Sequence, residues 1–146
     1  MTMREILFRG KHSHKSMWDY GDLYIDHDKV YIGMRETMHG VRVHGEVIPD
    51  TIGQYTGLTD KNGKKIFEGD ILSIARRMDG MGTYYFPAIE YPVNVVVKWD
   101  MCSWMWETIA EDTRYISFPD AWCHYECEVI GNIHDNPELM EGERHG

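Results

Sequence analysis

Residues 49–72 read PDTIGQYTGLTDKNGKKIFEGDIL, and this stretch decides the fold. The run QYT at 54–56 is aromatic and β-branched, and such residues fit a pleated, half-buried sheet. The turn sequence DKNG at 60–63 contains Asn-Gly, which predicts a type I′ hairpin with positive φ at both central residues. The run KIF at 65–67 resumes an extended chain, EGD at 68–70 forms a second turn, and a further strand begins at Ile71.

Strand signals extend outward from this stretch at intervals of eight to twelve residues. They comprise a hairpin of 23–25 and 30–32 around a four-residue loop, a central strand at 93–99, an alternating run at 104–106 and a late strand at 125–130. Asn136 is a good N-cap and Pro137 suits the first position of a short helix. The pattern predicts a mainly β fold, a small antiparallel barrel-like (SH3-like) core with additional N-terminal strands and a short C-terminal helix.

The literal string QYTGL-DKNGK-I-EGDI resembles the YopX family of phage and prophage proteins. The opening run at 3–9, VVVKWD at 95–100 and EVIGNIHDNPEL at 128–139 are similar to further family segments, in the same order. Residues 11–45 and 76–92 match no pattern of the family. The resemblance implies a mostly β fold with a barrel-like core, a tendency to oligomerise and a phage or prophage origin. It implies no settled activity and supplies no catalytic residues.

Length and composition predict a single globular domain. The chain has 146 residues, of which 42% are hydrophobic, enough for a core without disulfides or metal. We expect an N-terminal β segment at 1–48, the family core at 49–140 and a polar tail at 141–146. The chain contains no apolar run of membrane-spanning length, and charged Arg4 and Glu5 replace a secretory signal. We therefore expect a protein of the bacterial host cytoplasm, away from membranes.

The net charge of −9 disfavours nucleic acid as a partner, because binding to phosphates relies on clustered Lys and Arg. Three small groups of cations could still form local patches. They are Arg76 with Arg77, Arg4 with Arg9, and Lys61 with Lys64 and Lys65. The simpler interpretation is that these side chains are solvated.

Two groups of residues could hold a metal ion. Cys123 and Cys127, with Cys102 elsewhere, are soft ligands of the kind that zinc prefers. An odd number of cysteines in a cytosolic protein points instead to free thiols. Free cysteines usually serve as small, buried hydrophobic residues. His12 and His14 could combine with Asp26 or Asp28, although polar turns explain these pairs more simply.

The sequence predicts no catalytic, cofactor-binding or metal-binding residue and no cofactor. No G-x-S-x-G elbow and no glycine-rich phosphate loop occurs. Cys123 and His124 are adjacent on a predicted strand, where their side chains point to opposite faces. The paired acids Glu111 and Asp112 resemble a turn.

Aromatic residues are dense for a domain of this size: Trp99, Trp104, Trp106, Trp122, Tyr84, Tyr85, Phe86 and Tyr91. Most should be interior, and the surplus fits an oligomer interface. We therefore expect a non-enzymatic phage or prophage accessory protein, a self-associating β-rich module that binds a phage or host protein. One alternative is a nucleic-acid-directed protein, through local DNA or RNA binding or acidic DNA mimicry. Another is a metal-assisted hydrolase.

Overall fold

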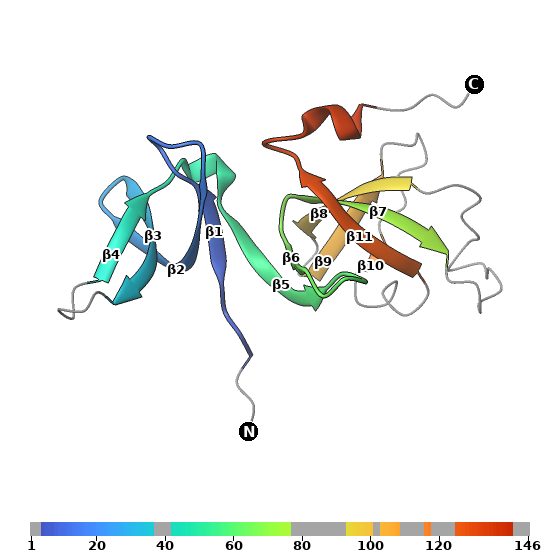
Figure 1. Ribbon diagram of the computed structural model, residues 1–146, viewed down its shortest axis with the longest axis horizontal. Helices are drawn as coiled ribbons and strands as arrows, with labels where there is room; N and C mark the ends of the chain where they lie inside the picture. The colour runs from blue at the N-terminus through green and yellow to red at the C-terminus, as the bar shows by residue number, and fades with distance from the viewer. Residues whose placement is uncertain are drawn as a thin grey trace. The chain divides into compact units, whose positions relative to one another are not determined.

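The computed structural model describes residues 4–36, 42–76, 93–100, 103–108, 116–117 and 125–141. The chain divides into two units, Met1–Gly57 and Leu58–Gly146. Strand β5 (Gly53–Thr59) carries the chain from the first unit into the second (Figure 1). The expected single domain with boundaries at 48 and 140 stays a prediction.

The described strands pair antiparallel, and they form two sheets. The first has the order β4-β3-β2-β1-β5-β6 and the second the order β10-β9-β8-β7-β11. The strands not yet given bounds are β1 (Phe8–Lys11), β2 (Trp18–Asp26), β3 (Lys29–Glu36), β4 (Arg42–Glu46), β6 (Lys65–Phe67), β7 (Asp70–Arg76), β8 (Val93–Asp100), β9 (Ser103–Thr108), β10 (Ile116–Ser117) and β11 (Tyr125–Asn132). The mainly β, antiparallel prediction is confirmed. The barrel, however, is not closed, and the SH3-like likeness stays a prediction.

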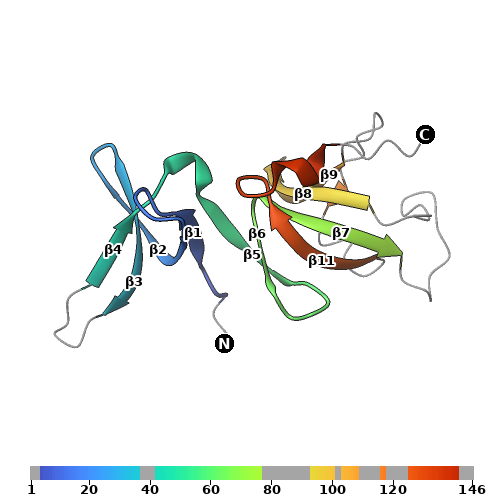
Figure 2. The same ribbon diagram turned by 45° about the horizontal axis from the view of Figure 1, so that its top comes forward.

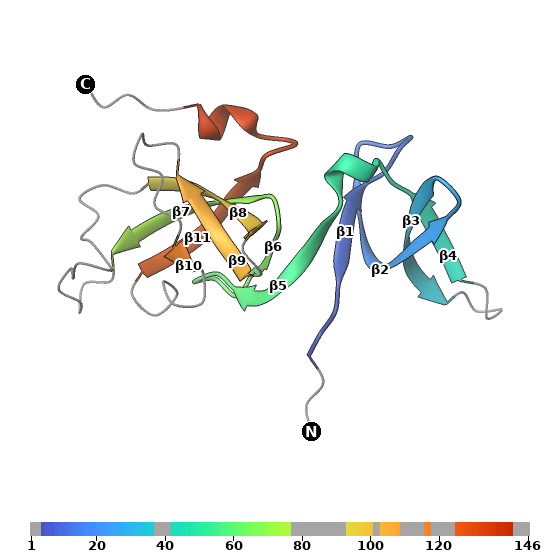
Figure 3. The ribbon, with the colours of Figure 1, turned by 180° about the vertical axis from the view of Figure 1, so that it is seen from behind.

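The first unit is a meander of β1 to β4, and Figure 3 shows β2, β3 and β4 side by side. The sheet curls, because His12 forms a bridge with Val47 just beyond the ends of β1 and β4. Ile48 N–H also donates to the carbonyl of Lys11 at 2.9 Å. Among the described side chains of this unit, Ile32 and Val47 are the fully buried aliphatic ones.

The second unit has the larger core, on one face of its sheet. Its buried members come from five strands: Ile66, Leu72, Ile74, Val95, Val97, Trp104 and Cys127. The register places them together, since Leu72 lies opposite Val95 and Ile74 lies opposite Cys127. Each buried aliphatic side chain stabilises the fold by about 1.5–3 kcal/mol. The predicted central strand at 93–99 is confirmed as β8, between β7 and β9.

The opposite face of this sheet carries the carboxyl-terminal turn. Ile71 and Val96 pair across β7 and β8 and are both buried. Asn94 donates from its side-chain amide to the carbonyl of Leu139 at 2.9 Å. Figure 2 shows β7 lying between β8 and β11, with the segment after β11 returning beside β8.

The predicted C-terminal helix is a single turn of 3-10 helix, η2 (Pro137–Met140). Asn136 occupies the N-cap position, but its side chain does not cap the turn. Its Oδ1 instead accepts a hydrogen bond from the backbone N–H of Asn132 at 3.3 Å. The side chain therefore closes the loop after β11, and it leaves no room for a Cβ at Gly131.

The turns follow the sequence, with two corrections. Among the described residues, the positive-φ glycines include Gly57, Gly63 and Gly69, whereas Asn62 has negative φ. The DKNG turn is therefore not type I′. Asp60 N–H donates to the Lys64 carbonyl and Gly63 N–H to that of Asp60, as in a three-residue loop with a left-handed Gly. The β2–β3 hairpin is confirmed, with a loop shorter than the predicted four residues because β2 ends at Asp26 and β3 begins at Lys29.

Candidate functional site

Aromatic side chains gather on one face of the first unit. Strand β2 reads WDYGDLYID, and its alternation puts Trp18, Tyr20 and Tyr24 on the same face. Tyr31 of β3 joins them, because it lies directly opposite Tyr24. We call Trp18, Tyr20, Tyr24 and Tyr31 the aromatic strip. The sequence signal for this strip is the alternation of aromatic residues in β2, which composition alone does not reveal.

The aromatic strip is accessible at its centre. Tyr20 is 41% exposed and Tyr24 is 51% exposed, whereas Trp18 and Tyr31 are half-buried. The rings of Tyr24 and Tyr31 pack with centroids 6.2 Å apart. Tyrosine has few side-chain torsions, so a held ring offers a flat contact area at low entropic cost.

Cations of β1 stand beside the strip. The register pairs Arg9 with Tyr20 and Lys11 with Trp18. The Arg9 guanidinium lies 4.9 Å from the centre of the Trp18 ring, a cation–π contact. The expectation that Arg9 is solvated is wrong, since only 6% of this residue is exposed. Its guanidinium group therefore lies over the indole ring of Trp18 and is largely shielded from water.

The opposite face of β2 buries a carboxylate. Asp19 is 6% exposed, and its Oδ2 has no hydrogen-bond partner among the described residues. A Cβ added at Gly45 would lie 2.5 Å from this oxygen and 3.3 Å from the imidazole Cδ2 of His12. Glycine at position 45 therefore makes the space that the carboxylate fills.

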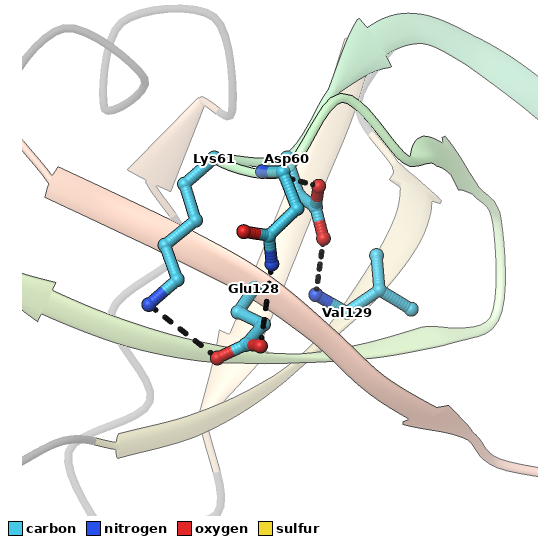
Figure 4. Close-up of polar contacts among 5 residues, drawn as sticks. Asp60, Lys61, Glu128 and Val129 are labelled. Atoms are coloured by element: carbon cyan, nitrogen blue, oxygen red, sulfur yellow. Dashed lines mark hydrogen bonds and ion pairs between the residues drawn. The ribbon is translucent and has the colours of Figure 1, made fainter.

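A second buried carboxylate joins the DKNG turn to β11 (Figure 4). Asp60 Oδ1 accepts hydrogen bonds from the backbone N–H groups of Asn62 and Lys64, each at 2.9 Å. Its Oδ2 accepts one from the N–H of Val129 at 3.0 Å, from a position 69 residues further along the chain. Glu128 adds contacts with Lys61 at 3.5 Å and with the Asn62 amide at 3.3 Å. We call this arrangement the Asp60 latch.

Two opposing effects act on the pKa of Asp60. Burial disfavours the charged form, but the three backbone N–H donors and the Lys64 charge favour it more. The net result is a pKa below the ordinary value of 3.8, so the carboxylate is ionised at neutral pH. We interpret the Asp60 latch as stabilising the fold, because the three donors to its carboxylate are backbone N–H groups of the turn and of β11.

The metal candidates of the first unit are held apart. His12 and His14 lie between β1 and β2, and the backbone N–H of His14 donates to His12 Nδ1 at 3.0 Å. Asp26 ends β2 and Asp28 follows it in the β2–β3 turn. A nine-residue strand separates the two pairs by about 26 Å of chain. Across the part of the chain that the structure describes, no three His, Cys, Asp or Glu side chains converge on one ion position.

Among the cysteines, Cys127 lies in the described residues and is a buried free thiol of the second core. Cys102, Cys123 and His124 lie outside the described residues, as do Glu111 and Asp112, Arg77 and the aromatic candidates at 84–91 and 122. Trp104 is buried as expected, but Trp99 is 55% exposed and packs edge-on against it with centroids 4.9 Å apart. Among the described residues, the structure has no helix of the length and apolarity needed to cross a bilayer.

Together these features define an all-β protein with a turn that a buried carboxylate joins to a distant strand and with an exposed aromatic sheet face. A model of the YopX protein family matches residues 7–141, so the chain belongs to this family. The string that carries the sequence resemblance contains Gly57, Asp60, Gly63, Gly69 and Asp70. Each has a structural use, in a positive-φ turn or a buried carboxylate.

Two solved structures share the fold. Protein EF1440 from Enterococcus faecalis is 23% identical, with a TM-score of 0.56 and coverage of 94% of this chain and 99% of that chain. Protein yopX from Bacillus subtilis is 18% identical, with a TM-score of 0.58 and coverage of 94% and 98%. No curated protein sequence matches the chain. At these identities the likeness concerns the fold alone.

Proposed function

We propose that this chain is a non-enzymatic contact module, a phage or prophage accessory protein that self-associates and holds a partner through the aromatic strip. The observation that carries the proposal is the strip itself. Tyr, Trp and Arg are the residues that dominate binding energy at interfaces, and here they stand together on one sheet face. Isolated exposed apolar side chains are common on any protein, but a row on one face is typical of a contact surface.

Self-association would use a different surface. The second unit exposes Trp99 by 55% and Ile130 and Ile133 by 37% each. Trp99 rests on the buried Trp104, so its ring is held in place before any contact forms. Both solved relatives come from bacteria, which agrees with an expected action inside a bacterial host cell.

Light scattering after size exclusion tests self-association at micromolar concentration. We expect an oligomer for the natural sequence and a smaller species for Trp99→Ser. The matched control is Lys61→Ser, which changes an exposed residue of the same unit outside its apolar residues and should leave the mass unchanged. A monomeric natural sequence would contradict self-association.

Affinity capture from host cells tests the strip. Tagged Tyr20→Ala/Tyr24→Ala protein should lose the partner that the natural sequence retains. Ile25→Ala is the control, because Ile25 is 64% exposed on the same strand but its side chain lies on the other face. Equal recovery of one partner by both variants would remove the strip as the contact surface.

A further inference from the structure

We propose that the aromatic strip binds single-stranded nucleic acid, whose bases stack on Tyr20 and Tyr24. This inference rests on the proposed function, in which the strip is a contact surface. It names the partner class that the chemistry of the strip fits best.

The geometry of the strip suits unpaired bases. Side chains at alternate positions of a strand are about 6.6 Å apart, so the rings of Tyr20 and Tyr24 are spaced by about 13 Å along β2. Separate rings on a sheet face offer flat surfaces to unpaired bases of one strand, and stacking of this kind tolerates any sequence. The two residues are exposed by 41% and 51%, so a base can reach them.

Positive charge accompanies the row of rings. Lys11 lies opposite Trp18, Lys15 is exposed in the loop between β1 and β2, and Lys29 lies on the strip face two residues before Tyr31. Two carboxylates, Asp22 and Glu46, share the face, and the Lys29 ammonium is 3.9 Å from Glu46. A phosphate would compete with Glu46 for that ammonium. We therefore expect modest affinity that falls steeply with salt.

The acidic charge of the chain belongs mainly to the other unit. The first unit has seven Lys and Arg against eight Asp and Glu, a net charge of −1. The second has eight against sixteen, a net charge of −8. The first unit also holds five of the eight histidines. The net charge of −9, which by itself disfavours nucleic acid as a partner, therefore does not describe the unit that carries the strip.

Fluorescence anisotropy with labelled oligothymidylate and oligouridylate tests the proposal. The probes should exceed the roughly 4–16 nucleotides that one small β domain covers, and a duplex of matched length is the comparison. We expect micromolar binding at low salt, with preference for the single strands. Tyr24→Ala and Tyr20→Ala should each weaken binding about tenfold, as loss of one stacked base predicts. Tyr24→Phe should retain binding because the ring remains.

Ile25→Ala and Trp99→Ala are the matched controls and should bind like the natural sequence. No anisotropy change at tens of micromolar and low salt would overturn the proposal, and so would binding that survives Tyr20→Ala/Tyr24→Ala. Equal affinity for duplex and single strands would also overturn it, since paired bases cannot stack on the rings. Capture of a protein through the strip, without nucleic-acid binding, would leave the proposed function intact and reject this inference alone.

Discussion

Both units bury carboxylates, and two of these, Asp60 and Asp19, differ in how their oxygens are hydrogen-bonded. Asp60 in the second unit has all its buried oxygens engaged by backbone N–H groups. Asp19 in the first unit has an oxygen without a partner among the described residues. Burial of a carboxyl group costs free energy unless hydrogen bonds within the protein replace those to water.

The same contrast runs through the side chains around them. The second unit has a contiguous hydrophobic core on one face of its sheet, whereas the described residues of the first include fewer buried aliphatic side chains and an exposed aromatic face. We infer that the second unit, which also carries the proposed self-association surface, supplies the more extensive core, and that the first unit presents its aromatic strip to a partner. Substitutions in each unit test that comparison.

Leu72→Ala should lower the free energy of unfolding of the second unit by about 2–5 kcal/mol, through lost burial and a residual cavity. Hydrogen exchange measured along the chain would locate the loss. Amides of β7 and β8 should exchange faster, while those of β2 and β3 keep their protection. Equal acceleration in β2 and β3 would show that the units unfold as one block, and the comparison would fail.

Gly45→Ala should destabilise the first unit by about 1–3 kcal/mol, because the new Cβ overlaps the carboxylate of Asp19. The double variant Gly45→Ala/Asp19→Ala should recover much of this loss, since the overlapping oxygen is gone. Urea unfolding of both variants provides the measurement. Additive effects of the two changes would mean that the carboxylate and position 45 do not compete for space.

Asp60→Asn should cost about 1–3 kcal/mol in the second unit, because an amide cannot accept all three N–H groups through charged oxygens. Lys61→Ala is the control from the same turn. It removes only a solvent-exposed ion pair with Glu128 and should change stability by no more than about 0.5 kcal/mol. Similar losses in the two variants would assign the latch to the ion pair instead.

Acid should weaken the latch in a direction set by its pKa. The pKa of Asp60 is lower in the folded protein than its ordinary 3.8, because the three backbone N–H donors outweigh the effect of burial. The stabilisation is therefore complete above the unfolded pKa and is lost as pH falls through the folded one. Unfolding at pH 7 and pH 3 should show a smaller acid loss for Asp60→Asn than for the natural sequence. An equal loss in both would exclude this linkage.

Asp19→Asn should leave stability unchanged or raise it by up to about 1 kcal/mol, because the buried Oδ2 of Asp19 has no hydrogen-bond partner among the described residues to lose. The size of the side chain is retained, so packing against Gly45 changes little. Thermal unfolding provides the measurement. A loss as large as that of Asp60→Asn would show that the two carboxylates do the same work.

The positions of turns could be predicted from the sequence, whereas contacts between residues far apart in the sequence could not. Gly63 and Gly69 could be assigned to turns from the sequence because glycine adopts positive φ without steric cost, whatever its neighbours are. The third donor to Asp60 is the backbone N–H of Val129, which lies 69 residues further along the chain, so the sequence near Asp60 does not predict this hydrogen bond. The predicted type I′ turn was also wrong, because the same Asn-Gly sequence is compatible with a two-residue loop and with a three-residue loop.

The candidate site shows the same limit. The alternation of Trp18, Tyr20 and Tyr24 was visible, but the exposed side of β2 depends on what β1 and β3 bring alongside it. Arginine is usually exposed, and the sequence around Arg9 gives no reason to expect its burial. Arg9 is buried because the pairing of β1 with β2 brings the Trp18 ring beside it. Asp19 likewise became a buried group only once Gly45 left space for it.

The buried thiol of Cys127 offers a native reporter. It lies 3% exposed among aliphatic side chains, so alkylating reagents can reach it only when the second unit opens. The rate of its labelling, resolved by peptide mass spectrometry, would then measure the frequency of opening without any engineered probe. If a ligand bound to the first unit slowed this labelling, the opening of the second unit would be coupled to binding at the first, through the strand β5 that joins them.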